Sequence, residues 1–222
     1  MHTLHQYTWV AGTASYRHQD GALRIVDAPS DADLGRWTML HDGDAHRLYC
    51  FKGRSVDTLY QFSLDGHSYR FGHRSIPELK LVEFPDDADP GSFAMLHDGR
   101  DYRLFLRRLG DPRTLYQAAW VAGTPSYRFG HRSIDTIPVT GFPDDTDWSR
   151  WSTLHDGAAY RLYTGSHRDP DLLYQGAFNV DAHAYQYGHR SIPRLTLEGG
   201  PGPLHSLAML HDGADYRAHR MR

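Results

Sequence analysis

The chain has 222 residues, of which 40% are hydrophobic and 23% charged, and this composition is typical of a globular protein rather than a disordered one. Its formal net charge of −3 lacks the basic excess of nucleic-acid and membrane-surface binders, so we expect neither partner. No apolar stretch approaches the ~20 residues that span a bilayer, no secretory signal is recognisable, and the single cysteine, Cys50, excludes internal disulfides. These features predict a cytoplasmic protein.

The first predicted elements are short strands. Leu4–Val10 is an aromatic strand, and another strand is expected near Tyr16. Trp37–Gly43 then ends in His-Asp-Gly, and Asp-Gly between apolar runs is a strong hairpin signal because glycine adopts the positive φ of the turn. Arg47–Gly53 and Thr58–Phe62 follow as the next two strands.

The following segment shows the pattern most fully. A polar loop is expected around Gly110–Pro112, and the loop Gly141–Asp147 crosses to the next copy. No segment of the chain has a sustained helical period, which favours an all-β fold. The four strands predicted here are Ser92–Leu96, Tyr102–Leu106, Leu115–Val121 and Tyr127–Gly130.

The motifs of these strands recur along the chain in a fixed order. Leu-His-Asp-Gly begins at Leu40, Leu96, Leu154 and Leu210, at intervals of 56, 58 and 56 residues. Leu-Tyr-Gln begins at Leu59, Leu115 and Leu173, and Gly-His-Arg-Ser-Ile begins at Gly72, Gly130 and Gly188. The sequence therefore contains four repeats, each of about 57 residues.

Four-stranded sheets repeated side by side predict a β-propeller, which protects its sheet edges by closing into a ring. The chain begins with a third-strand motif and ends after a second-strand motif, Tyr216–His219, so its two ends are expected to share one sheet. The predicted fold is an all-β, four-bladed β-propeller in which the N-terminal strands complete the last blade. One domain spans residues 1–222, with blades at approximately 31–80, 89–138, 147–196, and 204–222 plus 1–26.

The first repeat resembles the blade of the hemopexin-like family. A short inner strand precedes an aromatic strand that ends in Phe51-Lys52-Gly53, and a tyrosine-containing strand, Thr58–Phe62, follows. The length of the chain and the order of its strands also match that family. The resemblance implies a four-bladed propeller, and it transfers neither haem binding nor any site residue.

The Gly-His-Arg-Ser-Ile motif is the first candidate ligand site. Arginine forks and hydroxyl groups suit carboxylate, phosphate or diol groups, so the motif predicts a repeated anion or sugar pocket. The alternative is a structural corner in which the arginines pair with a loop aspartate of the next blade, such as Asp87 or Asp145. The candidate residues are His73, Arg74, His131, Arg132, His189 and Arg190.

The histidines of Leu-His-Asp-Gly are a candidate metal site. Four imidazoles related by a pseudo-fourfold axis could ligate a metal ion, such as zinc, in the central channel. The alternative is that each histidine only flanks a tight turn, in which the aspartate accepts bonds from local backbone amides. These histidines are His41, His97, His155 and His211.

Two further places depart from the common pattern. Trp148 and Trp151 adjoin a loop, where an indole ring could stack on a sugar. Where the other copies carry Gly-His-Arg-Ser-Ile, the first copy has His18 and Asp20. Function in a propeller usually breaks symmetry, so these residues and the loop Gly199–His205 are also candidates.

Repetition favours a non-enzymatic binding propeller that recognises carbohydrate or protein surfaces at several sites. One alternative is an enzyme with a single small-molecule site at the channel mouth, although no catalytic motif is present. A second alternative is metal or haem binding at the axis, and a metal ion there is the only cofactor we consider. Sixteen histidines also predict that stability falls below about pH 6 if many of them are buried and neutral.

Overall fold

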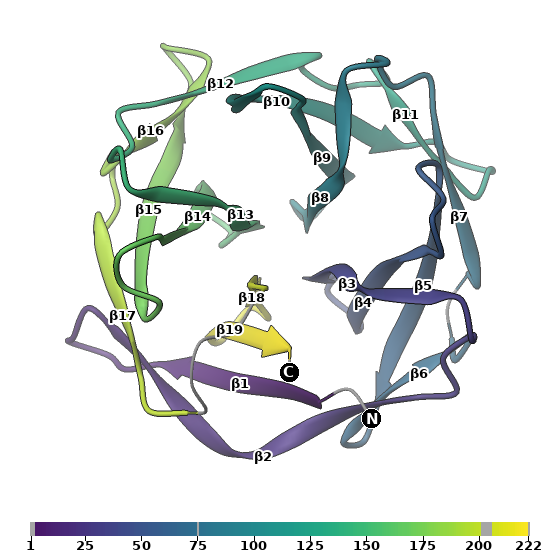
Figure 1. Cartoon of the computed structure of the whole chain (residues 1–222), viewed down its shortest axis with the longest axis horizontal. Coiled ribbons are helices and arrows are strands. Elements are labelled where there is room, and N and C mark those ends of the chain that lie inside the picture. The colour runs from purple at the N-terminus through teal and green to yellow at the C-terminus, as the bar shows by residue number, and fades with distance from the viewer. Residues whose placement is uncertain (1–2, 75, 201–205, 222) are drawn as a thin grey trace.

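The computed structural model describes residues 3–74, 76–200 and 206–221, and 19 strands form one ring-like sheet (Figure 1). Within these ranges no helix is long and apolar enough to cross a membrane. The strands fall into four units, and each unit runs from the axis of the ring to its rim.

The units repeat one strand order. The first unit contains β3 (Ala32–His41), β4 (His46–Lys52), β5 (Thr58–Asp65), β6 (Ser68–Phe71) and β7 (Glu78–Val82). The second contains β8 (Ala88–His97), β9 (Tyr102–Arg108), β10 (Asp111–Trp120), β11 (Ser126–Phe129) and β12 (Thr136–Thr140). The third contains β13 (Thr146–His155), β14 (Tyr160–Ser166), β15 (Leu172–Asn179), β16 (Ala184–Tyr187) and β17 (Arg194–Glu198). The fourth contains β18 (Ala208–His211), β19 (Tyr216–Met221), β1 (Thr3–Trp9) and β2 (Ser15–Val26).

The two ends of the chain meet in the fourth unit. β1 pairs with β19 in antiparallel register from Leu4 opposite Met221 to Thr8 opposite Arg217. Figure 1 shows the N- and C-termini on the same side of the ring. The predicted all-β class and the predicted closure of a propeller ring by head and tail strands are therefore confirmed.

The outer edge of each unit differs from the prediction of one fourth strand. In the first three units this edge is two short strands, β6 and β7 in the first, and both pair with β5. The second of these strands was missed because it is short and follows a turn motif at which the sheet was expected to end. In β12, for example, only Ile137 and Val139 are buried, which is too short a pattern to predict a strand. The polar loop predicted around Gly110–Pro112 is also wrong in part, since β10 already begins at Asp111.

The rim joins neighbouring units by parallel pairing. β2 pairs with β6, β7 with β11, β12 with β16, and β17 with β2. In the fourth unit, one long strand, β2, therefore replaces the two short outer strands of the other units. It pairs with β17 at one end and with β6 at the other. This belt of hydrogen bonds leaves few unpaired sheet edges.

The hydrophobic core lies between the units rather than inside them. Each pair of neighbouring units encloses one cluster of buried residues; between the first and second units it includes Phe51, Leu104 and Tyr127. The cluster between the fourth and first units includes Leu4 and Met221. Most aromatic side chains thus pack across the unit boundaries, and the same boundaries form the candidate site.

Candidate functional site

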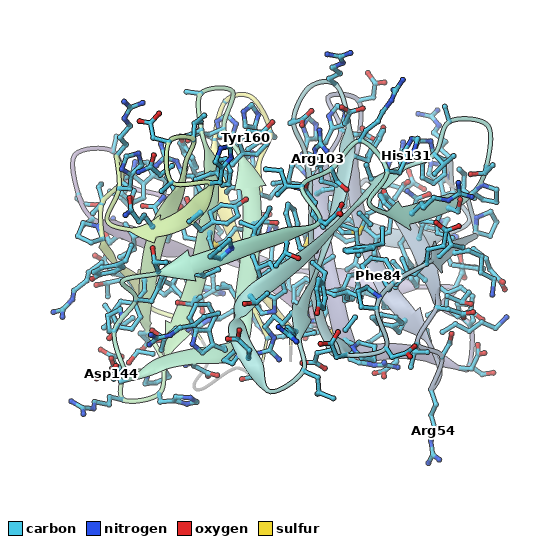
Figure 2. The ribbon with its side chains drawn as sticks, turned by 90° about the horizontal axis from the view of Figure 1, so that it is seen from above. Arg54, Phe84, Arg103, His131, Asp144 and Tyr160 are labelled. Carbon is cyan, nitrogen blue, oxygen red and sulfur yellow. The ribbon has the colours of Figure 1, made fainter. Side chains whose placement is uncertain are left out.

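Three cavities lie at equivalent positions between neighbouring units. The first pocket, between the first and second units, has a volume of about 370 Å³. The second pocket, between the second and third units, has about 460 Å³, and the third pocket, between the third and fourth units, has about 310 Å³. These volumes fall in the range of roughly 300–1,000 Å³ that small-molecule sites occupy. Arg103 and Tyr160 of the second pocket lie at one end of the ring, opposite Arg54 and Asp144 (Figure 2).

One wall of each pocket is built on the His-Asp-Gly turn. Gly43 has a φ of +91°, and Asp42 Oδ1 accepts hydrogen bonds from the backbone amides of Asp44 (3.1 Å) and Ala45 (2.8 Å). Asp42 Oδ2 accepts a hydrogen bond from Arg47 Nε, and Arg47 lines the first pocket. The turn role predicted for the aspartate is confirmed. The equivalent ion pairs are Asp98–Arg103 and Asp156–Arg161.

The aspartates of these turns are ionised although they are buried. Burial alone would raise the pKa of Asp42, but hydrogen bonds from Arg47 and from the backbone of Ala45 outweigh it, so the pKa lies below its ordinary value. The pKa values of Asp98 and Asp156 are lowered by the same balance between burial and hydrogen bonds. Each aspartate therefore neutralises the arginine beside it.

A tyrosine from the next unit is attached to each turn. The Tyr102 hydroxyl donates a hydrogen bond of 3.3 Å to Asp42 Oδ2 across the boundary between the first and second units. One carboxylate thus joins its own turn, an arginine and the neighbouring unit. The equivalent contacts, both 3.0 Å, run from Tyr160 to Asp98 and from Tyr216 to Asp156.

The rim of each pocket is the Gly-His-Arg-Ser-Ile turn. Arg47 Nη1 donates a hydrogen bond of 2.9 Å to the backbone oxygen of Arg74, whose φ is +44°. This left-handed conformation costs a residue other than glycine roughly 1–2 kcal/mol. The side chain of Arg74 is exposed and lines the first pocket. The equivalents are Arg132 (φ +46°), held by Arg103 at 2.6 Å, and Arg190 (φ +44°), held by Arg161 at 3.1 Å.

The opposite wall is aromatic and belongs to the next unit. In the first pocket the rings of Trp120 and Tyr127 meet edge to face, with centroids 5.4 Å apart. Such walls provide an apolar surface on which the C–H face of a small ring can pack. The equivalent pairs are Phe178–Tyr185 at 5.5 Å in the second pocket and Trp9–Tyr16 at 5.2 Å in the third.

A buried glutamine of the Leu-Tyr-Gln motif also lines each pocket. Gln61 Nε2 donates a hydrogen bond of 2.7 Å to the hydroxyl of Tyr49, which lies opposite on β4. In the second pocket Phe105 has the position of Tyr49, so Gln117 lacks this bond. The third pocket repeats the first, with Gln175 and Tyr163 at 2.8 Å.

The arrangement is suited to binding a polar ligand. Guanidinium and amide groups can donate hydrogen bonds to hydroxyl or carboxylate oxygens, and the aromatic wall can cover an apolar face. Among the described residues that line the three pockets there is no histidine and no carboxylate. The ionisable side chains among these lining residues are arginines and tyrosines.

Of the residues predicted from the Gly-His-Arg-Ser-Ile motif, the arginines line the pockets. His73, His131 and His189 precede them in the turns and are not lining residues. The predicted pairing of the arginines with Asp87 or Asp145 is wrong. Asp87 pairs with Arg108 at 2.8 Å, and Asp145 accepts a hydrogen bond of 2.8 Å from Tyr174, because both crossover loops lie against their own unit.

The two tryptophans predicted to stack on a ligand pack inside the protein instead. Trp151 is 3% exposed, and its Nε1 donates a hydrogen bond of 2.9 Å to Ser92 Oγ of the neighbouring unit. Trp148 is half-buried and packs on Phe142, with ring centroids 5.5 Å apart. Neither is among the residues that line the three pockets, since both belong to the core between the second and third units.

The four axial histidines surround a very small opening. His41, His97, His155 and His211 line a space of about 10 Å³, which is room for roughly one water molecule and too little for haem or a substrate. His97 stacks on Tyr102 of its own hairpin, with centroids 4.4 Å apart. In the described part of the chain no group of three or more histidine, cysteine or acidic side chains could hold a metal ion. Each of the four rings packs on a ring of its own hairpin, as the turn alternative predicts.

The symmetry-breaking residues of the first copy lie away from the three pockets. His18 is on β2, where its ring lies 5.4 Å from that of His5 and 5.2 Å from that of Tyr7. Asp20 is exposed in the same uninterrupted strand. Residues 201–205 of the predicted loop Gly199–His205 are outside the described residues.

Sequence reasoning missed most of the residues that form the pockets. The inner arginine, the tyrosine before it and the glutamine all belong to repeated patterns, for example Tyr102-Arg103 and Gln117 in the second repeat. The repetition of these polar residues was a usable signal. What the sequence did not show was that Tyr160, from the next unit, completes the pocket of Arg103.

The boundary between the fourth and first units, here called the closing interface, lacks this constellation. β2 has no Gly-His-Arg-Ser-Ile turn and hence no counterpart of Arg74. His219 has the position of Tyr49, and its ring is fully buried with no hydrogen-bond partner for either nitrogen among the described residues. Burial lowers the pKa of His219 to about 3, and the charges of His46 and Arg217 add to this effect.

No protein-family model and no curated protein sequence matches the chain. Similar solved structures include AofleA from Arthrobotrys oligospora, 14% identical, with 82% of this chain and 49% of that one covered and a TM-score of 0.36. The SapL1 lectin in complex with alpha methyl fucoside is 13% identical, with 78% and 50% covered and a TM-score of 0.36. A fungal lectin described as a six-bladed propeller, the Aleuria aurantia lectin, is 12% identical, with 79% and 49% covered and a TM-score of 0.34.

The chain thus spans about half the length of these solved structures. Identities of 12–14% with TM-scores of 0.34–0.36 are too low to transfer a ligand, a site or a number of blades. None of the three is named as a hemopexin-like protein, so the resemblance of the first repeat to that family stays a prediction.

Proposed function

We propose that the protein is a non-enzymatic, four-bladed β-propeller that binds carbohydrate at three equivalent sites between its blades. The four units are the blades, and the three pockets are the sites. The observation that carries the proposal is the threefold recurrence of one constellation in pockets of about 310–460 Å³. An arginine fixed by a buried aspartate, a second arginine on the rim, a glutamine and an aromatic wall occur together each time.

The chemistry of the constellation favours a sugar over other small ligands. A pyranose ring has an apolar C–H face, which suits the aromatic wall formed by Trp120 and Tyr127 in the first pocket. Its hydroxyl groups accept hydrogen bonds, and Arg47 is held in place to donate them because Asp42 and the backbone of Arg74 fix its guanidinium. Pockets of this volume favour a ring-sized group over an extended protein surface.

Three equivalent sites also favour multivalent recognition. Each pocket lies beside a His-Asp-Gly turn, and these turns are at the same end of the ring. A surface that displays many copies of one glycan could therefore engage several sites at once. Linked binding of this kind raises avidity without any new contact.

A glycan array followed by NMR titration of the ¹⁵N-labelled protein tests the proposal. The probes should include neutral sugars such as methyl α-fucoside, which SapL1 binds, together with acidic sugars. Trp120→Ala, Phe178→Ala and Trp9→Ala should each weaken binding at one pocket by about tenfold, because each removes part of an aromatic wall.

Leu64→Ala is the matched control. Leu64 occupies the position of Trp120 at the closing interface, where it packs against the core. This variant should leave binding unchanged. The absence of binding to every sugar on the array, or an equal loss of binding in the control, would overturn the proposal.

A further inference from the structure

We infer that the sugar bound by the three pockets carries a carboxylate, and that Arg74, Arg132 and Arg190 receive it. The inference rests on the proposed function and adds the chemical class of the ligand. Its basis is a positive charge that is left uncompensated at the rim of each pocket.

Among the described residues, each pocket is lined by two arginines and by no acidic side chain. The inner arginine, Arg47 in the first pocket, is neutralised by Asp42, whose side chain is 2% exposed. The outer arginine, Arg74, forms no ion pair with any described residue and is exposed to solvent. One positive charge per pocket therefore remains for the ligand.

The backbone at these arginines gives a second reason. Arg74, Arg132 and Arg190 have φ values of +44°, +46° and +44°, a conformation in which glycine or asparagine would be less strained. Nothing among the described contacts of their side chains stabilises the fold. The same strained arginine in all three turns is explained if its guanidinium contacts the ligand.

The inner arginines prepare the outer ones for this role. Arg47, Arg103 and Arg161 bind the backbone oxygens of Arg74, Arg132 and Arg190 at 2.9, 2.6 and 3.1 Å. This contact fixes each outer residue at the mouth of its pocket, so little backbone entropy is lost on binding.

The charge and shape of the site select a carboxylate. A planar guanidinium can donate two parallel hydrogen bonds to a carboxylate, and one free charge per pocket matches a monoanion. The neighbouring isoleucines, Ile76, Ile134 and Ile192, are 40%, 39% and 43% exposed and line the same pockets, so they offer apolar contact to the sugar ring. A hexuronic acid combines these groups.

The test compares galacturonic acid with its methyl ester and with galactose, by NMR titration at low salt. The three sugars share one ring, and only galacturonate carries a charge. We expect galacturonate to bind about tenfold or more tightly than the other two, because only its carboxylate forms a charge-assisted hydrogen bond. This preference should decrease as salt is raised, because salt screens charges at an exposed site.

The variant R74Q/R132Q/R190Q should abolish the preference for galacturonate over its methyl ester, because both then meet a neutral rim. The affinity for galacturonate should therefore fall more than the affinity for the methyl ester. The control R24Q/R54Q/R168Q removes the same number of charges from exposed arginines outside the pockets and should behave as the wild type. Equal binding of all three sugars would overturn the inference and leave the proposed function standing. A sulfated galactose is a fourth probe, and tighter binding of it than of galacturonate would have the same meaning. Failure of every sugar to bind would overturn both.

Discussion

The three pocket-bearing interfaces and the closing interface share one scaffold and differ in what fills it. At the first three, an arginine turn forms the rim and a tyrosine from the next unit bonds to a buried aspartate. At the closing interface the turn is missing, and His46 of β4 takes the place of that tyrosine, 3.8 Å from Asp212. The closing interface is filled by a core cluster that includes Leu4 and Met221, whereas the other three interfaces also leave room for a ligand.

This difference indicates that closing the ring and forming a pocket require different features of the strands. The pairing of β1 with β19 needs only backbone hydrogen bonds and apolar side chains such as Leu4. A pocket additionally needs a rim turn, and β2 omits that turn so that it can run uninterrupted along two neighbouring units.

The largest effect is expected from breaking a buried ion pair at a pocket-bearing interface. Arg161→Met leaves Asp156, whose side chain is 1% exposed, without its cation, and should lower the free energy of unfolding by about 3–5 kcal/mol. Arg217→Met at the closing interface should lower it by only about 1–2 kcal/mol, because Asp212 is 11% exposed. Urea unfolding at pH 7 measures both values.

A second substitution separates the charge from the shape of the side chain. Adding Asp156→Asn to Arg161→Met removes the unpaired charge, so the double variant should recover part of the lost stability. If Arg161→Met were no more destabilising than Arg217→Met, the two kinds of interface would not differ in electrostatics as described.

The next effect concerns His219 at the closing interface. His219→Phe removes two buried ring nitrogens that have no hydrogen-bond partner in the described ranges, and it should stabilise the protein by about 1–3 kcal/mol at pH 7. The gain should grow at lower pH. An unfolded histidine takes up a proton as the pH falls through its ordinary pKa of about 6.5, whereas the folded pKa of His219 is about 3. His219 therefore lowers the free energy of unfolding of the wild type as the pH falls from about 6.5 to about 3. The variant lacks this ring and does not show that loss.

Urea unfolding of wild type and variant at pH 7, 6, 5 and 4 measures this difference. His67→Gln, at an exposed position, serves as the control and should follow the wild-type curve. Parallel curves for wild type and His219→Phe would show that His219 does not cause the pH dependence.

The repeats and the closure of the ring could be predicted because the order of the motifs along the chain shows both. The strand motif Leu4–Val10 and the terminal motif Tyr216–His219 are incomplete parts of one repeat, and antiparallel pairing is the way to complete it. The second outer strand was missed because a five-residue strand such as Thr136–Thr140 leaves too short a pattern.

The pockets were harder to predict because each is shared between two units. The arginines of Gly-His-Arg-Ser-Ile were predicted to form a ligand pocket, and they line the three cavities. Spacing along the chain does not reveal that Tyr127 of the second unit lines the same cavity as Arg74 of the first. Nor does it distinguish Trp151, which is buried between units, from Trp120, which lines a pocket. Packing between repeats decides these roles.

The smallest predicted effect tests whether the second pocket differs from the other two through one hydroxyl. Phe105→Tyr places a hydroxyl opposite Gln117, where Tyr49 accepts a hydrogen bond from Gln61 in the first pocket. The new bond should stabilise the protein by about 0.5–1.5 kcal/mol, measured by urea unfolding.

Tyr163→Phe in the third pocket is the reverse change and should destabilise by a similar amount, because Gln175 Nε2 loses its 2.8 Å bond. The second pocket, at about 460 Å³, is the largest of the three, so it has room for the added oxygen. Loss of stability in Phe105→Tyr would mean that the space opposite Gln117 is closed, and that the second pocket differs from the others by packing rather than by a missing hydrogen bond.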